Sequence, residues 1–345
     1  MPTLYLNRRA TSVSREGEHL LVKQHDLPNS PQQVVPLHDL TSVVVVGEPS
    51  ITFPALSCFI QRQIPVSFLS VGGAWRGCID TSADAYGERR AKQYRKSLEV
   101  DFALPMAKSL IAAKLYNSLR LLQRLEAGRT LSPIVSDEDL HHKHQLKWIY
   151  NHLQSSGSAN ALRGLEGIGA VHYFSLLRHF FPVDVPFEKR QRHPAKDPAN
   201  ALLSWAYALL LSEIVSLLRQ HYLDPAMGVL HVNANRAPSL ALDLMEPFRP
   251  AFADRLVLNL LNRRVIQANK HFVTTDKGAV LLNEVGRTVF FSAYENALTR
   301  PFVNPQTEQN TTLREVLHQH VVSYLRYLEA PEGMPIQPPM CFHLP

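Results

Sequence analysis

Cysteine is scarce in this chain, which has three cysteines among its 345 residues: Cys58, Cys78 and Cys341. No two of them have the short spacing of zinc-binding pairs, which argues against a zinc ribbon and against a disulfide framework. Charged residues are also few, at 19%, whereas apolar residues reach 45%. This balance excludes wholesale disorder and allows a large core, and the length suggests about two domains.

An uninterrupted apolar run of about 20 residues, as a membrane span requires, is missing as well. The most apolar stretch, Ala201–Leu218, contains three serines and Glu213, and we interpret it as a buried helix. Near the N-terminus, Arg8 and Arg9 are followed by no apolar stretch of signal-peptide length. We therefore expect a soluble cytoplasmic protein with reduced cysteines and no contact with a membrane.

Positive charge is in excess, with 36 basic and 30 acidic residues and a net charge of +6. The excess is concentrated between positions 86 and 130, where ten residues are basic and four are acidic. A basic helical surface is often merely solvated, but it also suits a polyanionic partner such as nucleic acid.

The pattern predicts an α+β protein, with a small N-terminal β-rich domain followed by a larger all-α domain. Residues 1–82 hold short runs of β-branched and aromatic residues between turn residues. Strands are predicted at 3–6, 19–23, 33–35, 42–46, 66–69 and 75–79, with one helix at 53–62.

The composition becomes helical after residue 82. We expect a linker and helix start at 83–95, the all-α domain at 96–330 and a proline-rich tail, extended or mobile, at 331–345. Helices are predicted at 85–99, 104–127, 137–154, 159–181, 198–222, 240–267, 281–298 and 312–329, with a strand pair at 272–281.

Acidic residues and a histidine occur at three places where the pattern is otherwise apolar. Glu166 lies among small and apolar residues, where a carboxylate is costly unless it is paired or binds a metal. His231 lies in a short link between two helical patterns. Asp243 and Glu246 share a helix face, behind Ser239 as the predicted N-cap, and a nearby cation would relieve their repulsion. Purely structural roles stay open for each.

Together these residues supply carboxylate oxygens and one imidazole nitrogen. This donor set suits Mg²⁺ or Mn²⁺ better than Zn²⁺, which prefers thiolates and imidazoles. On a basic protein, such a site suggests metal-assisted phosphodiester chemistry.

A fourth stretch places a basic loop before an apolar helix. The loop contains Arg190 and Arg192, and the helix carries Asn200, Ser204 and Tyr207 at spacings that line one face. This polar stripe either satisfies a hydrogen-bond network in the core or supports the acidic site.

In their joint order these motifs resemble the integrase-nuclease family of CRISPR adaptation, which inserts new spacers into a repeat array. The resemblance is carried by Glu166-Gly167, the stretch 190–207, Leu230-His231 and the stretch 239–249. It covers nearly the whole chain. The departures, at His193, Ala195 and Asn235-Arg236, fall in loops and touch no presumed ligand.

The resemblance implies a catalytic helical domain that joins a DNA 3′-hydroxyl to a phosphodiester by transesterification, or cuts DNA when water attacks. It implies Glu166, His231 and Glu246 as ligands of Mg²⁺ or Mn²⁺, with Asp243 as a further ligand or a supporting group. The candidates for binding DNA phosphates are Arg190, Arg192, Arg249, Arg89, Arg90, Lys92 and Lys114.

The resemblance also implies the partners of the protein. These are double-stranded DNA, both spacer precursor and repeat, a second copy bound through the β-rich domain, and a small dimeric protein that bridges two such homodimers.

Two other functions stay open. A non-catalytic DNA-binding scaffold of the same fold would need the basic surface but no metal. A helical metallo-phosphodiesterase for small substrates would need the metal but not the basic stretch. The cluster His141-His142-Lys143-His144 has no evident fourth zinc ligand, so we expect exposed, titrating histidines there.

Overall fold

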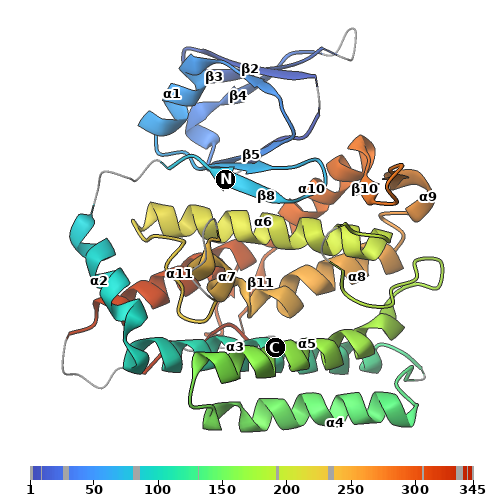
Figure 1. The fold of residues 1–345 in the computed structure, drawn as a ribbon. Coiled ribbons are helices and arrows are strands. Elements are labelled where there is room, and N and C mark those ends of the chain that lie inside the picture. Colours follow the sequence, from blue (N-terminus) through green and yellow to red (C-terminus); the bar gives the residue numbers. More distant parts are fainter. Residues whose placement is uncertain are drawn as a thin grey trace.

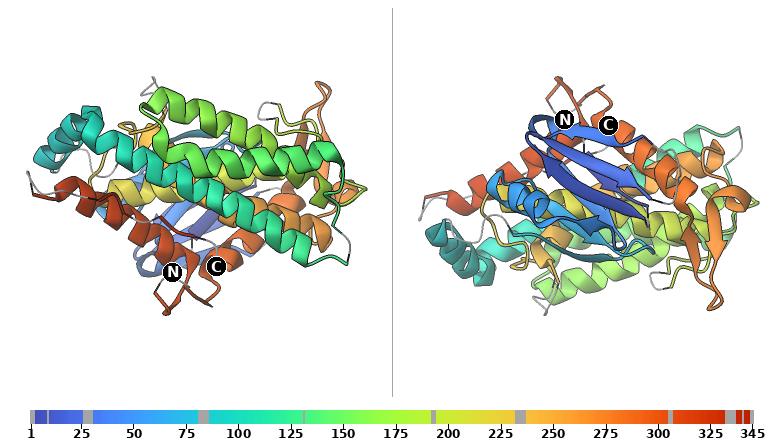
Figure 2. Two further views of the ribbon diagram at one scale, coloured as in Figure 1. Left: turned by 90° about the horizontal axis from the view of Figure 1, so that it is seen from below. Right: turned by 90° about the horizontal axis from the view of Figure 1, so that it is seen from above.

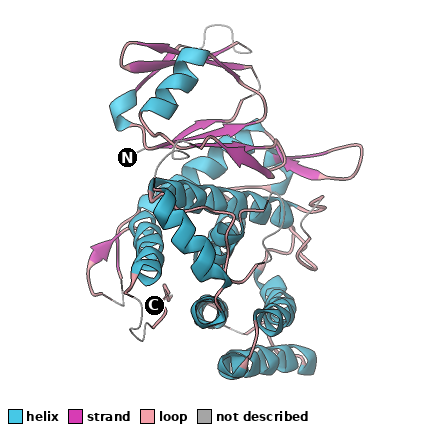
Figure 3. Ribbon diagram, turned by 60° about the vertical axis from the view of Figure 1, so that its left-hand side comes forward, coloured by secondary structure: helices cyan, strands magenta, loops and turns pink. Residues whose placement is uncertain are grey.

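The computed structural model describes residues 3–8, 10–25, 31–80, 86–130, 132–191, 194–231, 237–304, 307–331, 337–339 and 341–343. Figure 1 shows a β-rich N-terminal part above a larger body of helices, and Figure 3 shows most strands gathered at that end. The predicted α+β class is confirmed. The predicted boundary at residue 82 lies outside the described residues.

Two four-stranded sheets build the N-terminal part. The first has the order β1-β5-β7-β8, in which the first three strands are parallel and β8 is antiparallel to β7. The second has the order β4-β3-β2-β6. The elements are β1 (Thr3–Leu6), β2 (Thr11–Glu16), β3 (His19–Gln24), β4 (Gln33–Pro36), η1 (Leu37–Asp39), β5 (Ser42–Val46), β6 (Ser50–Ile51), α1 (Phe53–Gln61), β7 (Val66–Leu69) and β8 (Trp75–Cys78).

Strand β5 is shared by two hydrophobic cores, because successive side chains of a strand point to opposite faces. Val43 and Val45 belong to the core of the N-terminal domain. Val44 and Val46 belong to the core of the helical domain, which also contains Trp205 of α6. The four valines are almost fully buried, which explains the continuous β-branched run in the sequence.

The helical domain is arranged around α6. This helix contacts β7 and β8 on one side and α7, α8 and α11 on the other, and Figure 2 shows the β-rich part lying across it. The elements are α2 (Gly87–Leu98), α3 (Val100–Ala127), α4 (Asp137–His152), η2 (Leu153–Ser155), α5 (Ala159–Leu177), η3 (Arg178–Phe180), α6 (Pro198–Gln220), α7 (Ser239–Met245), η4 (Arg249–Asp254), α8 (Arg255–Asn262), α9 (Ala268–His271), β9 (Phe272–Thr274), β10 (Val280–Leu282), α10 (Glu284–Thr299), β11 (Phe302–Val303), β12 (Asn310–Thr311) and α11 (Leu313–Glu329).

Helix α6 is long and apolar enough to cross a membrane, yet 72% of its most apolar window is buried inside the protein. This burial confirms the prediction of a core helix at Ala201–Leu218.

The single helix predicted at 240–267 is wrong. The structure has α7, the π-helix η4 and α8 in its place. Pro247 and Pro250 explain the interruption, because proline has no N–H for the i−4 carbonyl. Ser239 is the first residue of α7 rather than its cap, and Pro238 takes the N-cap position.

The described part of the proline-rich tail is held against the helical domain. Ser109 of α3 donates a hydrogen bond to the carbonyl of Pro339 at 2.9 Å, and Asn117 donates to that of Phe342 at 2.9 Å. The Phe342 ring stacks on Phe248 with a centroid distance of 5.7 Å. Of the two expectations for the tail, extended or mobile, these contacts favour an extended segment fixed on the helical domain.

Candidate active site

Helices α3 and α5 approach closely and bring Lys114 to Glu166. Gly169 permits the approach, since a Cβ there would lie 3.0 Å from a methyl carbon of Leu115. Glu166 lies three residues earlier, on the same side of α5. Its Oε1 forms an ion pair with the Lys114 ammonium, whose side chain is only 12% exposed.

Glu246 follows α7 and is fully buried. Its Oε2 lies 2.6 Å from Nζ of Lys114, and its Oε1 accepts a hydrogen bond from Nε of Arg249 at 3.0 Å. Burial alone would raise the pKa of Glu246, but Arg249, Lys114 and His231 outweigh it and lower that pKa well below its usual range. The Lys114 ammonium thus contacts both predicted carboxylate ligands.

Asp243 holds the segment before His231. Its carboxylate accepts hydrogen bonds from the backbone N–H groups of Val229, Leu230 and His231 at 2.6, 2.9 and 2.9 Å. Gly228 makes room for this arrangement, because a Cβ there would lie 2.6 Å from the Asp243 carboxylate.

Asp243 also orients the imidazole of His231, whose Nδ1 lies 2.5 Å from Oδ1 of Asp243. Burial would lower the pKa of His231, but the hydrogen bond to Asp243 raises it above its ordinary value. With Nδ1–H as the donor, Nε2 carries a free lone pair. This nitrogen lies 3.9 Å from Oε1 of Glu246. Both oxygens of Asp243 have partners, which favours the supporting role over the ligand role.

Two guanidinium groups lie against the ring of Tyr207. The Cζ atoms of Arg190 and Arg249 are 5.3 and 4.7 Å from the ring centroid. Asn200 and Ser204 accept hydrogen bonds from Arg190 at 2.8 and 3.1 Å. The predicted polar stripe of α6 therefore positions Arg190.

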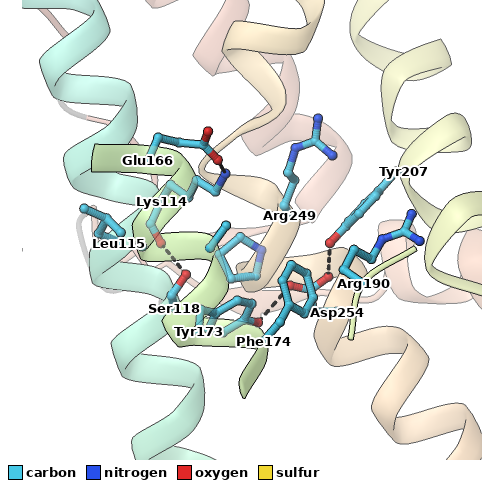
Figure 4. Close-up of a pocket in the computed structure, with 13 residues that line it drawn as sticks. Lys114, Leu115, Ser118, Glu166, Tyr173, Phe174, Arg190, Tyr207, Arg249 and Asp254 are labelled. Carbon is cyan, nitrogen blue, oxygen red and sulfur yellow. Dashed lines mark hydrogen bonds and ion pairs between the residues drawn. The ribbon is translucent and has the colours of Figure 1, made fainter. Parts of the chain in front are cut away.

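Asp254, at the end of η4, anchors this aromatic group. It accepts hydrogen bonds from the hydroxyl groups of Tyr207 at 2.5 Å and Tyr173 at 2.8 Å, as Figure 4 shows. Burial raises the pKa of Asp254 to about 6. Through Tyr207, this network supports the side chains of Arg190 and Arg249, which lie against the tyrosine ring.

Beside these groups lies a cavity of about 50 Å³, which has room for a few water molecules. The polar residues that line it are Lys114, Ser118, Glu166, Tyr173, Arg190, Tyr207, Arg249 and Asp254. Side chains from α3, α5, α6, η4 and the loop before α6 thus meet at the cavity. Glu246 does not line it but contacts Lys114 and Arg249, which do, and Nε2 of His231 lies 3.9 Å from Glu246.

The residues present fit a hard divalent cation. In the described part of the chain, no three His, Cys, Asp or Glu side chains converge closely enough to hold a metal ion as they stand. However, Glu166 and Glu246 already direct oxygens at one cation, the Lys114 ammonium. Oε2 of Glu246 is buried and accepts no well-aligned hydrogen bond. Two carboxylates and one imidazole suit Mg²⁺ or Mn²⁺.

The other predicted residues lie elsewhere. Arg89, Arg90 and Lys92 are on α2 and do not line the cavity, and Arg89 forms an ion pair with Glu329. Arg192 lies outside the described residues.

In the histidine cluster, Nδ1 of His142 lies 2.7 Å from Nδ1 of His172, a residue of α5. The side chain of His142 is only 15% exposed, so it is more buried than we predicted.

Sequence reasoning missed two members of the site. Asp254 and Tyr173 were not singled out, although an acid inside the apolar run before Arg255 was a usable signal. Lys114 was expected on DNA rather than between carboxylates, and no local pattern distinguishes those roles.

Solved structures share this fold. A Cas1 protein from Thermotoga maritima superposes with a TM-score of 0.79 at 24% identity, covering 97% of this chain and 99% of that one. A casposase bound to integration product reaches 0.83 at 23% identity, covering 95% and 90%. The fold is therefore that of Cas1-like proteins.

Sequence comparison gives the family. The family model described as "CRISPR associated protein Cas1" matches residues 4–296. The CRISPR-associated endonuclease Cas1 1 of Chlorobaculum tepidum is 31% identical over 94% of each chain. This chain belongs to the Cas1 family, and the resemblance read from its motifs is confirmed.

Proposed function

We propose that the protein is a divalent-metal-dependent DNA integrase and endonuclease of CRISPR adaptation. The observation that carries the proposal is that two carboxylates meet at the Lys114 ammonium, next to an oriented imidazole and to a cavity lined by two arginines. The names of the relatives support it: one is an endonuclease, and a casposase was solved with its integration product.

In this proposal Glu166, Glu246 and Nε2 of His231 hold Mg²⁺ or Mn²⁺. When bound, the cation would activate a hydroxyl group and stabilise charge on the phosphate. Asp243 keeps the imidazole in the tautomer with a free Nε2. Arg190 and Arg249 bind phosphate oxygens, for which a planar guanidinium is suited.

We also propose the partners that the family suggests. Double-stranded DNA is the substrate, and two copies of the chain pair through the β-rich domain. A small dimeric protein bridges two such homodimers, in keeping with a solved complex named for Cas6-RT-Cas1 and Cas2, whose Cas1-containing chain has this fold.

A strand-transfer assay tests the proposal. Purified protein, the small partner and a supercoiled plasmid bearing a repeat receive short duplexes with free 3′-hydroxyls, with Mn²⁺ or with EDTA. We expect joining with Mn²⁺ only, and its loss in Glu166→Ala, His231→Ala and Glu246→Gln. Glu48→Ala, at an exposed acid of the N-terminal domain, is the matched control and should keep wild-type activity.

The outcome separates the alternatives. Tight DNA binding without joining or cutting under any metal indicates a scaffold. Faster turnover of a chromogenic phosphodiester than of DNA indicates a small-substrate hydrolase. Full activity of the three variants rejects the assigned residues.

A further inference from the structure

Lys114 occupies the position at which the two site carboxylates meet. Its ammonium contacts Oε1 of Glu166 and lies 2.6 Å from Oε2 of Glu246. The lysine side chain is 12% exposed and that of Glu246 is 3% exposed. This is a buried cation held by carboxylates from two separate elements, and no DNA is needed to explain it.

A cation is required there for a physical reason. Two carboxylates directed at one point repel each other strongly when water is excluded. Arg249 compensates Glu246 at its other oxygen, Oε1, so it does not lie between the two acids. Lys114 therefore offsets this repulsion and keeps both acids pre-arranged before any other cation binds.

The oxygens that Lys114 contacts are the ones a divalent cation would use. A cation bound to these two oxygens would lie only a few ångströms from an ammonium that kept its contacts, and that repulsion disfavours joint occupancy. Lys114 also lines the cavity that contains Arg190 and Arg249, so the released ammonium has a place beside two phosphate-binding groups.

We propose that Lys114 is an ionic placeholder: it neutralises Glu166 and Glu246 until a divalent cation takes its place, and is then released into the cavity to contact a phosphodiester. The inference rests on the proposed function, because it takes the two acids as metal ligands. It adds that Lys114 couples two events. When the metal ion binds, the Lys114 ammonium becomes available to a DNA phosphate, as a third cationic group beside Arg190 and Arg249.

Chemical labelling of lysine tests the release directly. Wild-type protein is treated briefly with an amine-reactive ester, with and without Mn²⁺, and the labelled lysines are quantified by mass spectrometry. We expect several-fold more label on Lys114 when Mn²⁺ is present. Lys108 of the same helix, which donates a hydrogen bond to the carbonyl of Gln154, is the internal control and should not change.

Glu246→Gln provides a second test in the labelling experiment. Removing one carboxylate charge loosens the hold on Lys114, so we expect high labelling of Lys114 in this variant without metal. Little further increase should follow when Mn²⁺ is added.

Titration calorimetry with Mn²⁺ supplies the reciprocal measurement. Lys114→Met removes the competing ammonium, so we expect the variant to bind Mn²⁺ about tenfold more tightly than wild type. Lys108→Met should bind like wild type.

The possible failures are distinguishable. Mn²⁺ binding to wild type with unchanged labelling of Lys114 overturns the placeholder role and leaves the metal site standing. Weaker Mn²⁺ binding in Lys114→Met also overturns it, because it makes Lys114 a support of the bound cation. Absence of Mn²⁺ binding to wild type overturns the metal site of the proposed function and the placeholder with it.

Discussion

Asp243 shows how one buried side chain can serve backbone and site together. Its two oxygens accept three backbone N–H groups and contact the imidazole of His231. An amide at this position would turn an NH₂ group toward N–H donors, which then lose their acceptor.

We expect Asp243→Asn to lower the free energy of unfolding by about 2 kcal/mol, because buried donors become unsatisfied. It should also weaken Mn²⁺ binding about 10–100-fold through the misoriented imidazole. Chemical denaturation and calorimetry measure the two effects. Asp224→Asn is the control, since Asp224 is half-buried and water can replace its hydrogen bonds. Equal effects in the two variants would contradict the role of Asp243.

Asp254 makes stability depend on pH. Its pKa is raised from 3.8 to about 6 in the folded protein, so the folded state retains a proton that the unfolded state loses. Stability from this group is therefore present at low pH and is lost as the pH rises through about 6.

From about pH 4 to about pH 7, the free energy of unfolding of wild type should fall by about 2–2.5 kcal/mol relative to Asp254→Asn. Denaturation curves of both proteins across this range measure the difference. Parallel pH profiles would show that Asp254 does not titrate in this way.

At the scale of the element, the irregular segment between α7 and α8 contributes several residues of the site. The π-helix η4 begins with Arg249 and ends with Asp254, both of which line the cavity. Such π-helical turns often occur at functional sites. A regular helix through the same residues would rotate these side chains to other directions, since the π-helix has a different number of residues per turn.

A second element-scale feature is the amide of Asn117, which connects α3 to the tail. It donates to the carbonyls of Pro247 at 2.8 Å and Phe342 at 2.9 Å, and it is fully buried. The tail is thereby fixed next to Glu246.

We expect Asn117→Leu to cost about 2–3 kcal/mol of stability, because two buried carbonyls lose their donor. It should also speed cleavage of the tail by a protease. Asn262→Leu is the matched control, since Asn262 also donates to two carbonyls but is exposed to water. An unchanged cleavage rate in Asn117→Leu would show that the tail is held by other contacts.

At the scale of the whole molecule, positive charge gathers in a second, larger cavity of about 730 Å³. Its lining includes Arg124, Arg255, Arg263 and Arg300 and, among the described residues, no acid. Burial and the nearby charges of Arg124 and Arg300 lower the pKa of Arg255. Arg124 belongs to the basic stretch predicted at 86–130, whereas Arg89 of the same stretch is paired with Glu329.

We therefore expect the salt dependence of DNA binding to respond more to this cavity than to α2. Replacing Arg255 and Arg300 by Gln should reduce the slope of log affinity against log salt by about 1–2, as each phosphate contact contributes about 0.9. Arg89→Gln should change it less. The measurement is a DNA-binding titration at several NaCl concentrations, and a larger change in Arg89→Gln would place the DNA on α2.

The sequence by itself determined the local elements and the residue types of the site. The strands at 42–46 and 66–69 and the helix at 198–220 follow from β-branched runs, proline and acidic caps and apolar periodicity, which depend on near neighbours. The family could also be read from the order of Glu166, His231 and Glu246. Strand β2 was missed because Val13 is its only apolar residue and offers almost no pattern.

Only the tertiary structure decided which charges face one another. In the sequence, Asp243 and Glu246 are two acids on one predicted helix face. In the structure, Asp243 hydrogen-bonds the imidazole of His231, whereas Glu246 forms an ion pair with Lys114. The sequence did not single out Asp254, and it predicted Lys114 as a contact to DNA phosphates rather than as the partner of Glu166 and Glu246. The physical reason is that local propensity acts between neighbours in the chain, whereas ion pairs among α3, α5 and the turn after α7 are set by how buried helices pack.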